Sequence, residues 1–289
     1  MEIHINGKKA NIVLESETNL GEVLTGIYTW LGNSGLFISG LEVDGTVYDS
    51  HSMERAFNLP LAGISAVNIA TSGWAELMLE ALVRLKQDLA AYTDPDKKTE
   101  SRAWISSPAA LFLEKNAPEL YDVAVKTLEG SVSPADTLAL VIERIREVEN
   151  PGEEMRRAAA EAAEIVRRLE ELPLDMQTGK DSRAAETITL FSPLAEKIYR
   201  LIFLFRQFGA DIETIKVDLG TADSVNLESY INDFSAVLNE FTTAYENNDT
   251  VLVGDLAEYE LAPRLLRLCS ALCGIKTGKA AQTGEENQG

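Results

Sequence analysis

The chain has 289 residues, 45% of them hydrophobic, which excludes global disorder and allows two domains of ordinary size. Its 26 basic and 46 acidic residues give a formal net charge of -20, which disfavours nucleic acid and anionic membrane surfaces as partners. Residues Met1–Gly7 lack a signal-peptide pattern, and the longest apolar run, Leu201–Phe205, is far shorter than the roughly 20 residues of a membrane-spanning helix. We therefore expect a cytoplasmic globular protein.

The first 72 residues predict a small sheet around one helix. Ile3–Ile5 alternate apolar and polar, Asn6-Gly7 is a strong hairpin signal, and Ile12–Leu14 are expected to begin the returning strand. Thr18 or Asn19 can cap a helix with an apolar face over 20–31. Strands are then expected at 37–43, 47–48 and 67–69, with a turn-rich stretch around Pro60 and Gly63 before the last of them.

This order of hairpin, helix, strand, short strand and final strand resembles the ubiquitin-like β-grasp fold. The resemblance covers residues 1–72 and rests on element order. Members of that superfamily serve as modifiers, sulfur carriers, iron–sulfur carriers, RNA-binding appendages and docking modules. Here no free Gly-Gly end follows the domain, no cysteine lies in it, and three basic residues stand against eight acidic ones. Protein docking is the role that the resemblance leaves.

From Trp74 to Cys273 the apolar residues recur with a helical period, which predicts an all-helical domain over 74–276. A capping side chain precedes a proline at three expected helix starts: Ser107-Pro108, Ser133-Pro134 and Asn150-Pro151. Further helices are predicted over 74–92 and 117–128, with a polar loop at 93–98 between them. The predicted fold is thus α+β followed by an all-α, bundle-like domain.

Two helical hairpins are expected in the second half of the chain, over 152–208 and 225–274. In the first, Pro173–Gly179 close one helix, and Ser192-Pro193 either kinks one long helix or starts a second. The hairpins share a pattern displaced by 68 residues, which suggests a duplication and a four-helix bundle.

The second hairpin contains the clearest apolar seam of the chain. Its residues are spaced by four and three: Leu227, Ile231, Phe234, Leu238, Phe241 and Tyr245. A loop or irregular piece is expected before it, over Ala210–Ser224. Asn248 or Asp249 caps a final helix that Pro263 bends, and whose predicted apolar positions are Leu252, Leu256, Tyr259, Leu266 and Cys273. Residues 277–289 are expected to form a disordered tail.

Candidate catalytic and metal-binding residues are few. His4 and His51 are the only histidines, and neither stands at a recognised catalytic spacing. Cys269 and Cys273 are best explained as small hydrophobes in a reducing compartment. Four acidic residues of the irregular piece do not match a calcium loop and are expected to be solvated: Asp211, Glu213, Asp218 and Asp223. We therefore expect no catalytic residue, no cofactor and no metal.

The end of the 152–208 hairpin carries more apolar surface than one bundle face absorbs. We predict a partner-binding role for four of its residues: Phe203, Leu204, Phe205 and Phe208. The favoured hypothesis is a non-enzymatic interaction or scaffold protein with a protein partner or a homo-oligomeric state, such as a chaperone or adaptor of a bacterial secretion or motility system. The alternative is a small-ligand-binding or enzymatic protein with a site at the interface between its two domains, near Asp49 and His51.

Overall fold

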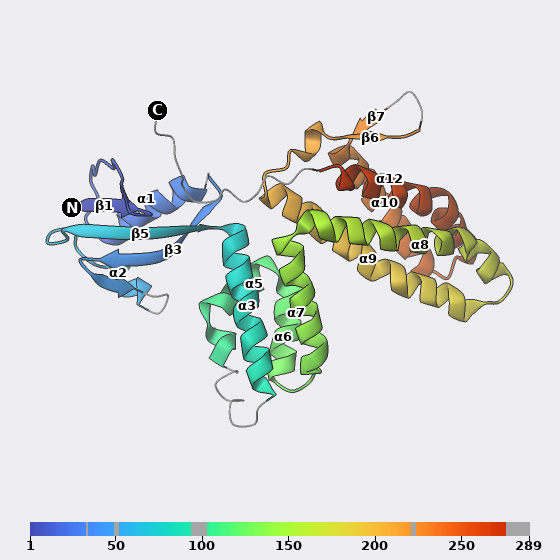
Figure 1. Cartoon of the computed structure of the whole chain (residues 1–289), viewed down its shortest axis with the longest axis horizontal. Coiled ribbons are helices and arrows are strands. Elements are labelled where there is room, and N and C mark those ends of the chain that lie inside the picture. Colours follow the sequence, from blue (N-terminus) through green and yellow to red (C-terminus); the bar gives the residue numbers. More distant parts are fainter. Residues whose placement is uncertain (33, 49–51, 94–102, 221–223, 276–289) are drawn as a thin grey trace. The chain divides into compact units, whose positions relative to one another are not determined.

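The computed structural model describes residues 1–32, 34–48, 52–93, 103–220 and 224–275. They belong to two compact units, Met1–Ile145 and Arg146–Gly289. The first unit begins with a small mixed sheet, and helices make up most of the remaining chain (Figure 1). The predicted layout of α+β followed by all-α is confirmed. The expected tail at 277–289 and most of the expected loop at 93–98 lie outside the described residues.

Five strands form the sheet in the order β2-β1-β5-β3-β4. β1 runs parallel to β5, whereas the other neighbouring strands are antiparallel. The strands are β1 (Glu2–Ile5), β2 (Lys8–Lys9), β3 (Leu36–Val43), β4 (Thr46–Tyr48) and β5 (Ala66–Gly73). The two edge strands, β2 and β4, are also the shortest strands of the sheet.

One face of the sheet packs against α1 (Leu20–Gly32). The Asn19 side chain caps this helix, because its Oδ1 accepts the Glu22 N–H at 3.0 Å. Apolar residues of the helix and the strands share one buried cluster: Ile3, Leu20, Val23, Leu24, Ile27, Leu31, Leu41, Val43, Val67 and Ile69. The alternating strand pattern of the sequence accounts for this core.

Two details of the first domain differ from the prediction. The returning strand is Lys8–Lys9, and Ile12–Leu14 lie in no strand. The reason is the two-residue turn, in which Asn6 and Gly7 both have positive φ and bring Lys8 directly opposite Ile5. A short helix that was not predicted, α2 (Met53–Phe57), lies before the turn-rich stretch around Pro60 and Gly63.

Helices make up most of the described residues 74–93 and 103–145 of the first unit, as predicted. Its elements are α3 (Trp74–Tyr92), the 3-10 turn η2 (Ala103–Ser106), α5 (Pro108–Asn116), α6 (Pro118–Leu128) and α7 (Pro134–Glu149), the last of which continues into the second unit. The Ser107 cap is confirmed, since its side chain accepts the Ala110 N–H at 3.2 Å. The indole N–H of Trp74 donates to Asn116 at 2.9 Å and so links α3 to α5.

Two long helices, α8 (Pro151–Gln177) and α9 (Asp181–Gln207), form a hairpin in the second unit. α8 ends at Gln177, within the stretch Pro173–Gly179 predicted to close it, but Pro173 itself lies inside the helix. Pro193 likewise lies within one continuous helix. α8 ends where Gly179 adopts a φ of 71° and the Lys180 N–H donates to the Asp175 carbonyl at 2.8 Å. The helix therefore ends next to a glycine that adopts a positive φ, and Pro173, which lacks a backbone N–H, does not end it.

The described residues between α9 and α10 (Leu227–Glu246) are more ordered than expected. It contains a 3-10 turn, η3 (Ile212–Thr214), and an antiparallel pair of strands, β6 (Lys216–Asp218) and β7 (Ser224–Asn226). β6 contacts the last helix of the bundle, and its central residue, Val217, is buried. One buried valine on three residues is too short a pattern to predict a strand.

The seam helix is α10 (Leu227–Glu246), and its predicted apolar face is buried up to Phe241 except at Leu238, which is half-buried. At its end Ala244 is buried and Tyr245 is exposed. A straight α-helix has 3.6 residues per turn and drifts by roughly 20° per heptad from a 3.5-residue spacing, which explains why the predicted seam leaves the core here.

The last helix is wound in two ways. α11 (Thr250–Asp255) and α12 (Ala262–Cys273) are α-helical, whereas η4 (Leu256–Leu261) between them is π-helical. Asp249 caps its start, because the side chain accepts the Leu252 N–H at 3.1 Å. The predicted face is wrong at Tyr259, which is 63% exposed, and at Leu266, which is also exposed. The wider π turn holds an extra residue and so rotates the apolar face that follows it.

Candidate functional site

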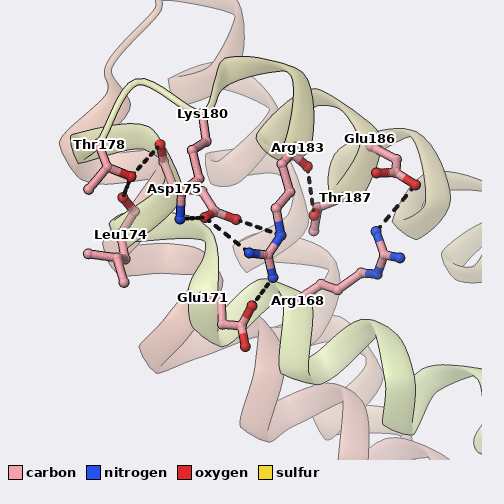
Figure 2. Close-up of polar contacts among 9 residues, drawn as sticks. All are labelled: Arg168, Glu171, Leu174, Asp175, Thr178, Lys180, Arg183, Glu186 and Thr187. Atoms are coloured by element: carbon pink, nitrogen blue, oxygen red, sulfur yellow. Dashed lines mark hydrogen bonds and ion pairs between the residues drawn. The ribbon is translucent and has the colours of Figure 1, made fainter.

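A buried carboxylate lies at the turn between α8 and α9 (Figure 2). Asp175 is 2% exposed and is contacted by Lys180 Nζ at 3.3 Å and by Arg183 Nε at 3.2 Å. Glu171 also pairs with Arg183, and Arg168 pairs with Glu186 at 3.4 Å. These contacts join the ends of two helices and neutralise a negative charge at a helix C-terminus, so the cluster is explained by folding.

A second set of buried charges lies in the same unit. Glu147 accepts from Arg200 at 3.0 and 3.2 Å, and Glu154 accepts from Lys197 at 2.9 Å and from Arg157 at 2.7 Å. Both carboxylates are almost completely buried. Each therefore has its cation in place and stabilises the packing of helices.

The four residues predicted to bind a partner have different surroundings. Leu204 and Phe205 are buried in the bundle, Phe208 is half-buried at the end of α9, and Phe203 is exposed. Gly209 then turns the chain with a φ of 77°, and the Ala210 N–H donates to the Phe205 carbonyl at 2.9 Å. Two of the four side chains thus belong to the core, and the partner-binding role stays a prediction.

An open groove of about 700 Å³ begins at the residue after this turn. One wall is the segment that contains η3 and β6, and the other is the second half of α12 and the residues after it. The residues that contribute to it are Ala210, Asp211, Thr214, Ile215, Lys216, Asp218, Gly220, Arg267, Ser270, Ala271, Gly274 and Ile275. Small residues on α12 leave the space that the opposite wall does not fill.

Charges of both signs face this groove. Arg264, one turn before Arg267, is paired with Glu260. Arg267 and Lys216, by contrast, make no ion pair with any residue in the described ranges. Burial raises the pKa of Tyr230 on α10, and the guanidinium of Arg267 beside its hydroxyl opposes that shift. The groove thus offers guanidinium and ammonium donors to an acceptor from outside.

Carboxylates stand on the wall that faces Arg267. Asp218 Oδ1 accepts the Gly220 N–H at 2.8 Å, which orders the end of β6. Asp211 lies at the start of η3, where its side chain makes no capping hydrogen bond. Groups that donate and groups that accept hydrogen bonds therefore both line the groove.

The remaining candidate residues form no site among the described parts of the chain. Burial raises the pKa of the Cys269 thiol to about 12, with a smaller contribution from Cys273, so this thiol is a poor nucleophile. His4 lies on β1, and His51 and Asp49 lie outside the described residues. Within the described ranges, no three His, Cys, Asp or Glu side chains are grouped to hold a metal, and no helix is both long and apolar enough to cross a bilayer.

Sequence reasoning missed this groove. Asp211 and Asp218 are exposed, which agrees with their prediction as solvated loop charges, but that prediction does not place them on a groove with Arg267. The one available signal was the switch from a helical period to a short non-helical segment between two long helices.

Comparisons with known proteins match two separate parts of the chain to protein families. Residues 1–72 match a family described as the TP0873 N-terminal domain, and residues 153–271 match a domain of unknown function, DUF8042. The chain is 29% identical over 110 residues to an uncharacterized protein of Treponema pallidum (strain Nichols). The match covers 38% of this chain and 52%, about half, of that relative. No solved structure matches. An N-terminal domain over 1–72 is therefore supported, and most of the groove lies in the second matched region.

Proposed function

We propose that this chain is a non-enzymatic protein-interaction or scaffold protein whose C-terminal bundle holds a segment of a partner in the groove between α12 and the η3–β6 segment. The observation that carries the proposal is the groove itself, which is open, has a volume of about 700 Å³ and is lined on two sides by hydrogen-bonding groups. Recognition grooves for peptides combine such polar groups with space for side chains.

The lining suits a peptide segment for a chemical reason. A peptide presents carbonyl oxygens and N–H groups in alternation, and the groove has Arg267 and Lys216 to donate and Asp211 and Asp218 to accept. The small side chains of Ser270 and Ala271 leave room for the side chains of the segment. The net charge of -20 favours approach by a basic partner, because opposite charge accelerates association.

The proposal also covers the first domain and the cellular setting. We infer a ubiquitin-like β-grasp fold for residues 1–72, supported by the strand order and by the parallel pairing of β1 with β5. A cytoplasmic location is supported by the two free cysteines. The narrower version, a chaperone or adaptor of a bacterial secretion or motility system, rests on analogy with acidic helical proteins that hold export substrates.

Site-directed photo-crosslinking in cells tests the groove. A photoreactive amino acid replaces Ser270 in the groove, and a matched chain carries it at Glu161, an exposed position of α8. We expect a defined crosslinked protein from position 270 that is absent from position 161. The added substitution Arg267→Glu should abolish that product. Identical products from both positions, or a product that Arg267→Glu leaves unchanged, would contradict the proposal.

A second candidate is small-ligand binding in the same groove, which the volume also permits. Native mass spectrometry of the purified chain separates the two functions. A small retained mass that Ser270→Trp removes would favour a ligand. The alternative of a site at the interface between the two domains stays a prediction.

A further inference from the structure

The edge strand β2 continues into an exposed apolar segment. Lys8 and Lys9 pair with β1, and the Ala10 N–H still donates to the Ile3 carbonyl at 2.8 Å. The backbone of Asn11–Leu14 then makes no hydrogen bond with any residue in the described parts of the chain. An unpaired, apolar continuation of a sheet edge is a template for another strand.

Side-chain exposure along this segment alternates as it does in a strand. Ile12 and Leu14 are 37% and 38% exposed, whereas Val13 between them is 83% exposed. Ala10 packs against the core of the sheet. In a strand that extends β2 through Leu14, Ile12 and Leu14 lie on the same face as Ala10, and Val13 lies on the other face. The sequence favours a strand here, and none of the described residues pairs with this segment to complete one.

The charges that flank the segment are placed symmetrically about Ile12. Lys9 lies three residues before Ile12 and Glu15 lies three residues after it. In an antiparallel pair centred on Ile12, Lys9 of each chain stands opposite Glu15 of the other chain. The dimer therefore contains two such facing pairs. Opposite charges in directly facing positions stabilise strand pairing.

We propose that a second copy of this chain covers the segment, and that the two copies pair antiparallel with Ile12 opposite Ile12 of the partner subunit. The two five-stranded sheets then become one continuous sheet across the dimer. The proposal concerns a surface that the groove proposed above does not use.

The register follows from which residues share a face. Pairing centred on Ile12 places Ala10 opposite Leu14 of the partner subunit, and both lie on the core side of their sheets. A shift of the partner by one residue would place Ile12 opposite Val13 of the partner subunit and mix the core side with the outer side. The apolar side chains are therefore buried together in one register.

The ion pairs favour this register over other registers, but they add little to the affinity between the two copies. Lys9 already pairs with Glu2 of its own chain, and both side chains are exposed. An ammonium group has three donors, so Lys9 can contact Glu15 of the partner subunit as well. Exposed pairs contribute little to affinity, but like charges in the same positions oppose association.

A charge exchange in the full-length chain tests the dimer. Sedimentation-velocity measurements from about 1 to 500 μM at 0.15 M salt, where charges beyond roughly 8 Å are screened, follow the oligomeric state. We expect a reversible dimer for the wild type and an association about tenfold weaker for Lys9→Glu and for Glu15→Lys separately. An equal mixture of the two variants should dimerise again, because each facing pair then has opposite charges.

A disulfide measurement tests the register separately. In a chain with Cys273→Ser, Ile12→Cys should form a disulfide-linked dimer on mild oxidation, because Cα atoms of facing strand residues are about 5 Å apart. Leu14→Cys is equally exposed but does not face itself, and should link at least tenfold more slowly. A monomeric wild type at every concentration, or a mixture no more dimeric than the single variants, would overturn the proposal. Equal linking at positions 12 and 14 would overturn the register. None of these results affects crosslinking from position 270.

Discussion

Gly254 of α11 lies directly against Pro173 of α8. A Cβ atom added to Gly254 would stand 3.1 Å from the Pro173 Cβ and 3.2 Å from its Cα. Neither atom belongs to a flexible side-chain end, so α8 and α11 would have to move apart by a few tenths of an ångström. We expect Gly254→Ala to lower the free energy of unfolding by about 1–3 kcal/mol, the usual cost of overpacking. Urea unfolding followed by the loss of helical circular dichroism measures the change.

Gly26 of α1 provides the matched control. It also lies inside a helix, but no atom stands within 4 Å of an added Cβ. Alanine has the higher helix propensity, so Gly26→Ala should stabilise the chain by about 0.5–1 kcal/mol. Equal effects of the two substitutions would show that close packing at Gly254 is not the cause.

Arg183→Ala should destabilise the α8–α9 hairpin. The substitution leaves the buried carboxylate of Asp175 with Lys180 as its remaining cation among the contacts shown in Figure 2. We expect a loss of about 1–3 kcal/mol in chemical unfolding. Arg167→Ala removes an exposed pair with Glu164 on the same helix and should cost less than about 0.5 kcal/mol. A larger loss of stability from Arg167→Ala than from Arg183→Ala would contradict the explanation that the buried Asp175 carboxylate needs its cations.

Two asparagines that precede helices should differ in their contribution to stability. The Asn226 side chain accepts the Ser229 N–H at 2.7 Å, whereas Asn150 makes no side-chain capping bond. Asn226→Ala should therefore cost about 1 kcal/mol and Asn150→Ala only a few tenths, in thermal or urea unfolding. Equal losses of stability in the two variants would mean that the capping hydrogen bond of Asn226 does not contribute measurably to stability.

Stability should fall at alkaline pH because of Cys269. Its pKa rises from 9.0 to about 12 in the folded chain, so the folded state holds the proton more tightly than the unfolded state. The stabilising effect is complete below pH 9 and is lost as the pH rises toward 12. Burial shifts the pKa of Tyr199 and Tyr230 in the same direction. We expect the urea midpoint to drop between pH 8 and pH 10.5, and to drop less in Cys269→Ala. An identical slope in that variant would contradict the assignment.

The sequence predicts most elements of the fold because their signals are local. The Asn6-Gly7 turn, the apolar face of α1 and the serine cap before Pro108 each depend on residues within a few positions of one another. Hydrophobic periodicity likewise identifies α8, α9 and α10.

The errors arise where distant packing decides. Pro173 remains inside α8, where Gly254 of another helix leaves room for it. The groove depends on how the short strand β6 lies on α12, and no pattern within either segment specifies that contact. The prediction of a strand at Ile12–Leu14 is wrong for a local reason instead, because the two-residue turn brings Lys8 opposite Ile5 and makes Lys8–Lys9 the returning strand.

The π-helical turn η4 makes the length of the last helix important. It already accommodates one residue more than regular winding would hold between α11 and α12. The turn could therefore lose a residue such as Glu258 and become regularly wound without turning the helix after it, whereas a residue added to the regularly wound α11 would turn everything after it by about 100° about the axis. Leu265, Leu268 and Leu272 would then leave the bundle, and Arg267 would no longer face the groove. Homologues that retain the groove should therefore differ in the length of this last helix only at the π turn, where one residue fewer gives regular winding.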